Sequence, residues 1–175
     1  MALLYCKEPM EQGNVNLNQH SWKILEYTPS LKQVFLTGEA KTIKTALVRL
    51  YFQIMTYGKA KLICAINDCG EVMHTSYLVP RCFKFCFLDK NDFEVGPCYT
   101  NPNFRGKGIY PAVLDYICSN YGNKKTMFYM IVDDNNVSSI RGIEKAGFRI
   151  CGRVKKSYLF KRYHLLFKTE GEKNG

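Results

Sequence analysis

The chain of 175 residues lacks any apolar run of the ~18 residues that a membrane-spanning helix needs. Its first eight residues carry no basic segment and only a short apolar stretch, which argues against a signal peptide. No two cysteines have the C-x-x-C spacing and only three histidines are present, so we expect neither a zinc ribbon nor any other metal. Together these absences predict a protein of the cytoplasm.

Cysteine is abundant, but the cysteines do not lie in the loop-rich sequence that is typical of a disulfide-stabilised domain. Small secreted domains place their cysteines in loop-rich chains, whereas most of the eight cysteines here stand within apolar segments. We therefore expect reduced thiols that pack as small hydrophobic side chains. The cysteines in apolar segments are Cys64, Cys82, Cys86, Cys98, Cys118 and Cys151.

Acidic residues are scarce: 15 Asp and Glu stand against 25 Lys and Arg, which gives a net charge of +10. A basic surface attracts nucleic acid, anionic membranes and phosphorylated small molecules, although a merely solvated basic face explains it equally well. The sequence contains no reading helix and no aromatic-basic ribonucleoprotein motif. A basic nucleic-acid-binding domain is therefore the weakest of the functional hypotheses.

The composition is that of an ordinary globular protein, with 46 % hydrophobic residues. Its length predicts one domain, which we place at 1–168, followed by a polar tail at 169–175. The apolar spacing predicts a mixed α/β fold whose first 58 residues are helical. Helices are expected over 16–38 (broken near Pro29), 43–54, 109–117 and 137–146, and strands over 59–67, 72–79, 92–100, 127–132, 149–160 and 161–167.

Two residues interrupt the strand predicted over 92–100. Pro97 cannot donate a hydrogen bond to a neighbouring strand, and Gly96 offers no side chain to pack. Such a pair in the middle of a strand predicts a β-bulge, which turns the strand away from its neighbour.

A glycine-containing basic loop then joins this strand to the next helix. The segment from Thr100 to Pro111 holds Gly106 and Gly108, and Pro111 suits a first helical turn. Unpaired backbone N–H groups at a helix start attract anions, and small residues let a phosphate approach them. The loop is neither a Walker A loop nor a dinucleotide fingerprint. It predicts a pyrophosphate cradle, with a purely structural turn as the alternative.

Two segments resemble motifs of the GNAT N-acetyltransferase superfamily. Arg105 and Gly108 match the first and fourth positions of [QR]-x-x-G-x-[GA], while Tyr110 departs from the final small residue. Residues 136–148 resemble the N-x-x-[AS]-I-x-x-x-E-K-x-G-F segment of the same family. The resemblance covers about residues 59–160.

The resemblance implies a single domain with a mostly antiparallel central sheet, flanked by helices, whose fourth and fifth strands splay to admit acetyl-CoA. Residues 59–168 would bind CoA, and the helical residues 1–58 would lie on the acceptor side. The backbone N–H of Cys98 would face the thioester carbonyl. The implied donor-binding residues are Cys98, Tyr99, Thr100, Arg105, Gly106, Lys107, Gly108, Ile109, Tyr110, Asn136 and Ser139. For Asn136, an N-cap role is an equal and compatible alternative.

The resemblance also implies the catalytic groups. Glu94 matches a carboxylate that acts as general base through a water molecule in some members, with an outward-facing strand residue as the alternative. The family's usual acid is a tyrosine, but Ile143 stands at its position, which leaves Tyr110 or Tyr129 as candidate donors. His74 is a candidate acceptor-binding residue or a satisfied structural histidine.

These inferences support three functions. The first is acetyl transfer from acetyl-CoA, by direct attack in a ternary complex, to a primary amine of a small molecule. A nucleotide-linked amino sugar would suit the basic surface, and residues 92–111 look similar to proteins of bacterial surface-polysaccharide biosynthesis. The second is a non-catalytic CoA-binding sensor, and the third is the nucleic-acid-binding domain. We expect a monomer or homodimer without a membrane partner.

Overall fold

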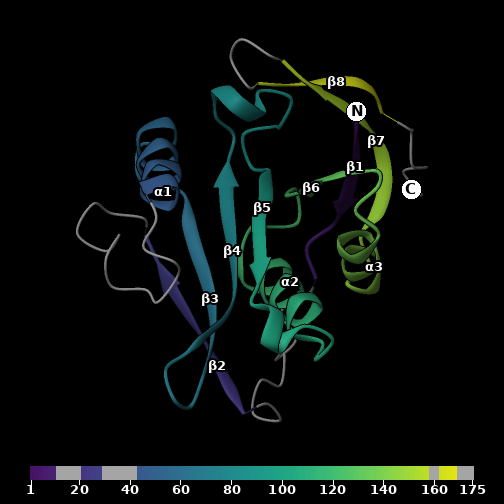
Figure 1. Ribbon diagram of the computed structural model, residues 1–175. Helices are drawn as coiled ribbons and strands as arrows, with labels where there is room; N and C mark the ends of the chain where they lie inside the picture. The colour runs from purple at the N-terminus through teal and green to yellow at the C-terminus, as the bar shows by residue number, and fades with distance from the viewer. Residues whose placement is uncertain (11–20, 29–42, 158–161, 169–175) are drawn as a thin grey trace.

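A computed structural model describes residues 1–10, 21–28, 43–157 and 162–168. They form one eight-stranded sheet in the order β2-β3-β4-β5-β6-β1-β7-β8 (Figure 1). All neighbouring strands are antiparallel except β5 and β6. The strands are β1 (Ala2–Lys7), β2 (Trp22–Tyr27), β3 (Lys61–Asn67), β4 (Val72–Pro80), β5 (Phe93–Thr100), β6 (Phe128–Asp133), β7 (Arg149–Lys156) and β8 (Tyr163–Lys168).

Within the described residues, three α-helices accompany the sheet: α1 (Ile43–Met55), α2 (Ile109–Asn120) and α3 (Val137–Lys145). Short 3-10 turns, η3 (Phe83–Phe85) and η4 (Pro102–Phe104), flank β5. In the described part of the chain, no helix has the length and apolar character needed to cross a membrane. The mixed α/β class and the mostly antiparallel sheet are therefore confirmed.

The sheet buries a separate apolar cluster on each face. One cluster joins the sheet to α2 and α3 through residues such as Val113, Ile117 and Ile143. The other cluster gathers Phe52 of α1 and Phe85 of η3 against the opposite face. We call these the α2 face and the α1 face.

The strands and helices predicted from residue 43 onward are confirmed, except that the strand predicted over 149–160 ends at Lys156 and residues 158–161 lie outside the described residues. The prediction of a helical N-terminal part is wrong. Residues 2–7 form β1, which lies between β6 and β7 inside the sheet. Within the predicted helix 16–38, the described residues 22–27 form β2 at the sheet edge. The apolar residues of β1 are buried on both faces, so their pattern showed no period of two. The predicted tail, 169–175, lies outside the described residues.

The helix α1 is confirmed, and it packs on the α1 face through Phe52. Leu47 and Ile54 are each 58 % exposed, whereas Phe52 is 1 % exposed. The Phe52 ring lies 5.3 Å from the Tyr77 ring of β4, measured between centroids. The helix therefore packs through Phe52 and the neighbouring Tyr51, while Leu47 and Ile54 turn outward.

The parallel pair among the described strands, β5 and β6, separates almost as soon as it forms. Just two positions pair, and the second joins Glu94 to Tyr129. Beyond it the two strands run in clearly different directions (Figure 1). The predicted splay is therefore confirmed, and we call the point after Glu94 the fork.

The predicted bulge in β5 lies at the fork. Gly96 and Pro97 stand opposite the single residue Tyr77 of β4, so the register shifts by one. As a result, Val95 and Cys98 both face the α2 side of the sheet. In a regular strand, two residues three positions apart would face opposite sides. The bulge thus decides which β5 side chains enter the space that the fork opens.

Gly152 tests the packing of the β7–β8 pair. A Cβ built at this position would collide with the backbone carbonyl oxygen of Phe167, and backbone cannot move aside as a side chain can. We predict that Gly152→Ala lowers the free energy of unfolding by about 1–3 kcal/mol, the usual cost of overpacking. Denaturant titration measures this. Ile150→Ala, which truncates a half-exposed side chain on the same strand, is the control. An equal effect of both substitutions would contradict the prediction.

Candidate functional site

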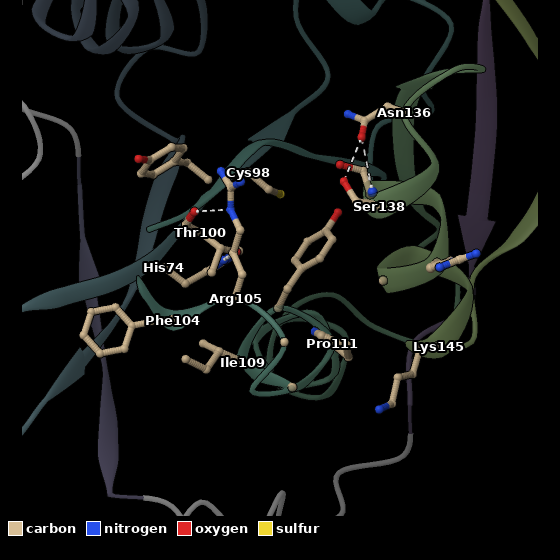
Figure 2. Close-up of a pocket in the computed structure, with 17 residues that line it drawn as sticks. His74, Cys98, Thr100, Phe104, Arg105, Ile109, Pro111, Asn136, Ser138 and Lys145 are labelled. Carbon is tan, nitrogen blue, oxygen red and sulfur yellow. Dashed lines mark hydrogen bonds between the residues drawn. The ribbon is translucent and has the colours of Figure 1, made fainter. Parts of the chain in front are cut away.

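A cavity of about 540 Å³ opens on the α2 side of the fork. Figure 2 shows Cys98 and Thr100 of β5 facing Asn136 and Ser138 near the start of α3 across this space. The lining comes from β4, β5, the loop before α2, and both helices: His74, Cys98, Tyr99, Thr100, Phe104, Arg105, Gly106, Gly108, Ile109, Tyr110, Pro111, Asn136, Ser138, Ser139, Arg141, Gly142 and Lys145.

The loop before α2 presents backbone donors to the cavity. Gly106 and Gly108 have φ of +77° and +74°, a left-handed conformation that glycine adopts without strain. Gly108 is the N-cap of α2, and no side chain caps the helix there. The first N–H groups of α2 are therefore available to an anion, and the helix dipole favours negative charge at that place. The side chain of Arg105 is tied back by a 3.2 Å hydrogen bond from its Nε to the Thr100 carbonyl oxygen.

A second helix start lines the opposite wall. Asn136 is the N-cap of α3, since its Oδ1 accepts a 3.3 Å hydrogen bond from the Ser139 N–H and a 3.2 Å bond from the Ser138 hydroxyl. The N-cap alternative for Asn136 is thus confirmed, and it leaves the side-chain amide N–H groups for other contacts. Both predicted donor-binding residues of this segment, Asn136 and Ser139, line the cavity.

The sequence reasoning missed part of this wall. Ser138, Arg141 and Lys145 also line the cavity from α3. Their spacing of three and four residues places them on one helix face, and that spacing was available in the sequence. With Arg105 they give the cavity three cationic side chains, which suit a phosphate-bearing ligand.

A chain of hydrogen bonds follows the β4–β5 wall of the cavity. Nδ1 of His74 lies 2.7 Å from Oγ1 of Thr100, and its Nε2 lies 2.8 Å from Oγ of Ser76. The Ser76 hydroxyl donates to Sγ of Cys98 at 3.1 Å. Burial lowers the pKa of His74 to about 3, so the imidazole is neutral. Because Ser76 donates onward, its oxygen accepts from the Nε2–H of His74, and Nδ1 accepts from Thr100.

His74 therefore has both ring nitrogens satisfied, as the alternative of a structural histidine predicts, and it lines the cavity. The thiol at the end of the chain is held neutral as well. Burial raises the pKa of Cys98 to about 12, against the opposing effect of the Ser76 hydrogen bond. A protonated thiol is a weak nucleophile, so this burial disfavours a covalent role for the Cys98 side chain.

Tyr110 bridges the two walls of the cavity. Its ring stacks on the His74 ring, with centroids 5.3 Å apart and planes 30° apart. On α3, a Cβ added to Gly142 would come within 2.5 Å of the Tyr110 ring, so the ring lies directly against the helix there. Its hydroxyl hydrogen-bonds Cys98. Burial, followed by the proximity of Cys98, raises the pKa of Tyr110 above its usual range.

Glu94 lies at the fork, on the other face of the sheet from the cavity. The neighbouring Val95 packs in the α2-face cluster, so Glu94 points to the α1 face. Its side chain curls over the bulge, since a Cβ on Gly96 would meet Oε1 at 2.9 Å. The residue is 5 % exposed, and Oε2 has no hydrogen-bond partner among the described residues. Burial raises the pKa of Glu94 to about 8, which the Lys84 ammonium partly opposes.

Lys84 faces Glu94 from η3 and is surrounded by aromatic rings. Its Nζ lies 4.8 to 5.8 Å from the centroids of three rings, those of Phe52, Phe85 and Tyr163. Burial lowers the pKa of Lys84, while Glu94 acts against that shift. The α1 side of the fork therefore holds a buried carboxyl group beside a cation, with π faces around them.

The structure thus brings most of the predicted site residues to one cavity. The exception in the loop is Lys107, which does not line it; its Nζ lies 4.9 Å from the Phe104 ring centroid. Of the two candidate proton donors, Tyr110 lines the cavity, whereas the Tyr129 hydroxyl accepts from Lys168 at 3.2 Å on the α1 face. Ile143 is 1 % exposed in the α2-face core.

Comparison with known proteins rests on structure. No family model and no curated sequence matches this chain. A GNAT-family acetyltransferase from Colwellia psychrerythraea superposes with a TM-score of 0.57 at 17 % identity, over 85 % of this chain and 52 % of that one. The chain thus spans about half of that protein's length.

Two further neighbours are covered almost completely. An aminoglycoside antibiotic 6′-N-acetyltransferase from Acinetobacter baumannii gives a TM-score of 0.55 at 12 % identity, over 77 % of this chain and 95 % of that one. A GNAT-superfamily phosphinothricin acetyltransferase from Sinorhizobium meliloti was solved with acetyl-CoA. It gives a TM-score of 0.53 at 18 % identity, over 89 % of this chain and 97 % of that one. The splayed strands, the glycine loop and these neighbours together show that the chain has the GNAT acetyltransferase fold.

Proposed function

We propose that this chain transfers an acetyl group from acetyl-CoA to a primary amine of a small molecule, with both substrates bound at once. The observation that carries the proposal is the fork. A phosphate-suited cavity reaches it from the α2 side, and a buried carboxyl group stands at it on the α1 side. Donor and acceptor would approach from opposite faces of the sheet.

The donor side fits acetyl-CoA, which supplies the acyl group already activated as a thioester. The open backbone N–H groups of α2 would bind the pyrophosphate, helped by the left-handed Gly106 and Gly108. Arg105, Arg141 and Lys145 would neutralise phosphate charge. The unpaired edge of β5 beyond the fork would pair with the pantetheine arm, as the resemblance implies for Cys98, Tyr99 and Thr100.

The acceptor side supplies a base. An amine attacks only after it loses its ammonium proton, and Glu94 is poised to accept that proton, directly or through a water molecule. Its raised pKa brings it close to working pH, where general bases act best. The Cys98 backbone N–H would stabilise the oxyanion that forms on the carbonyl. Direct attack is favoured over a cysteine intermediate, because the Cys98 thiol stays protonated.

The chemistry of the acceptor follows from charge. The net charge of +10 disfavours strongly cationic acceptors such as polyamines. An amino sugar carried on a nucleoside diphosphate combines one free amine with negative charge. The Acinetobacter neighbour acts on an aminoglycoside, which is also an amino sugar, though a polycationic one.

Turnover tests the proposal. We expect the chain to acetylate a member of an amine panel that includes nucleotide-linked amino sugars, as measured by mass spectrometry of the product. Glu94→Gln should lower kcat by about 10²–10⁴, the usual contribution of general base catalysis. Asp68→Asn, on the exposed β3–β4 turn, is the matched control. Full activity of Glu94→Gln would remove the base assignment, and CoA binding without turnover of any amine would favour the sensor function.

The pH profile gives a second test. With the wild-type chain, kcat/KM should rise with pH until Glu94 is ionised, near pH 8. Lys84→Met removes the cation that lowers the Glu94 pKa, so the rising limb should move to higher pH. The acceptor's own ionisation is the same for both proteins and cancels. If the rising limb of the kcat/KM profile stays at the same pH in the variant, Glu94 is not the group that determines it.

The buried carboxyl also affects stability. A carboxyl whose pKa is raised on folding, here from 4.5 to about 8, stabilises the fold at low pH and loses that stabilisation as the pH rises through this interval. Glu94→Gln cannot ionise, so it should be more stable than wild type at pH 8 by a few kcal/mol and comparable at pH 4.5. Urea denaturation at both pH values measures the difference. If the difference in free energy of unfolding between the wild type and the variant is the same at both pH values, the raised pKa of Glu94 is contradicted.

A further inference from the structure

The sulfur that leaves from a thioester needs a proton, and the expected donor position cannot supply one. Ile143 carries only hydrocarbon and is 1 % exposed in the α2-face core. Tyr129 is turned to the α1 face, where its hydroxyl accepts a hydrogen bond from Lys168. Any proton donor of this chain must therefore come from another element that reaches the fork.

We propose that the Tyr110 hydroxyl donates this proton to the departing sulfur of CoA; the inference rests on the proposed function. Tyr110 belongs to the first turn of α2, beside the loop that would hold the pyrophosphate, and its hydroxyl reaches Cys98 on β5. The Cys98 backbone is also where the carbonyl is expected. The hydroxyl thus lies next to the place where the C–S bond would break.

The ring is held in this position from both sides. The His74 ring stacks on it from β4, and Gly142 receives it on α3, where any larger residue would collide. Glycine weakens a helix interior relative to alanine, so Gly142 is unfavourable for α3 itself and is explained by the ring that it accommodates. Tyr110, which stands where the motif has a small residue, thus packs against Gly142, the residue that leaves room for its ring.

The groups around the hydroxyl keep it protonated until it is used. The ionisable groups next to it are Cys98 on β5 and His74 on β4, and from α3 the cations Arg141 and Lys145 line the same cavity. Glu94 acts on it only through its charge, from the other face of the sheet. His74 is neutral, Cys98 is a thiol, and burial raises the phenol pKa. A phenol in this setting carries its proton at any working pH.

The step balances without a further reactant. The amine nitrogen forms a bond to the acetyl carbon and loses one proton to Glu94. The C–S bond breaks, its electron pair stays on sulfur, and the sulfur takes the proton of Tyr110. When CoA leaves, Tyr110 regains a proton from solvent and Glu94 releases its own, so the chain returns to its starting state.

The first experiment needs no acceptor. Isothermal calorimetry compares CoA with desulfo-CoA, which has hydrogen in place of the thiol, at a series of pH values up to about 9.5, over which an increasing share of the CoA thiol ionises. The wild-type chain should bind CoA about tenfold or more tightly than desulfo-CoA, because a phenol that donates to a thiolate makes a charge-assisted hydrogen bond. Tyr110→Phe keeps the ring but should lose this preference.

Tyr116→Phe is the control, because Tyr116 lies on the same helix but its hydroxyl donates to Glu26 at 2.7 Å, away from the cavity. It should bind both ligands as the wild type does. Equal preference for CoA in wild type and Tyr110→Phe would overturn the proposal.

Turnover provides the second readout. With the acceptor found for the wild type, Tyr110→Phe should lower kcat by about 10²-fold or more while the KM for acetyl-CoA stays near its wild-type value. A purely structural role would instead raise KM, or change both constants as Gly142→Ala should by displacing the ring. Undiminished kcat would overturn the inference and leave the proposed function standing. A wild-type chain that binds no CoA would overturn both.

Discussion

The pairing of β5 with β6 at only two positions is the constraint on which the site depends. A parallel pair that continued would fill the fork with backbone hydrogen bonds and leave no place for a ligand. The bulge at Gly96 and Pro97 ends the pairing, and it also turns Cys98 to the same face as Val95. That change of face separates the two sides chemically: Cys98 enters the cavity, whereas Glu94 stays on the α1 face.

The burial of Glu94 shows that this arrangement is not optimised for stability alone. A carboxyl group with an unpartnered oxygen among the described residues destabilises a fold when it ionises. The nearby Lys84 ammonium offsets only part of that cost, and it is itself buried among rings. A group whose pKa is strongly shifted by burial beside a charged partner is typical of sites that move protons.

Much of the fold from residue 43 onward could be predicted. Its helices and strands show a regular spacing of apolar residues or end at a glycine. The loop with Gly106 and Gly108 and the interruption at Gly96 identified the fork for the same reason. The N-terminal strands could not be predicted so readily. The pattern of β1 has no period of two because both of its faces are buried, and its neighbours β6 and β7 lie more than a hundred residues away. The bridge from Tyr110 to Gly142 depends on how α2 and α3 pack, which local patterns do not encode.

In the function proposed here, the start of α2 binds the pyrophosphate of acetyl-CoA. Calorimetric titration of acetyl-CoA into the wild type, Gly108→Asn and Gly108→Asp tests it directly. Asn and Asp both tolerate the left-handed conformation of this residue and have nearly the same shape, so they differ mainly in charge. We expect micromolar binding by the wild type, binding largely retained by the Asn variant, and an affinity lower by about tenfold or more with the Asp variant. No binding by the wild type, or equal affinities of the two variants, would contradict it.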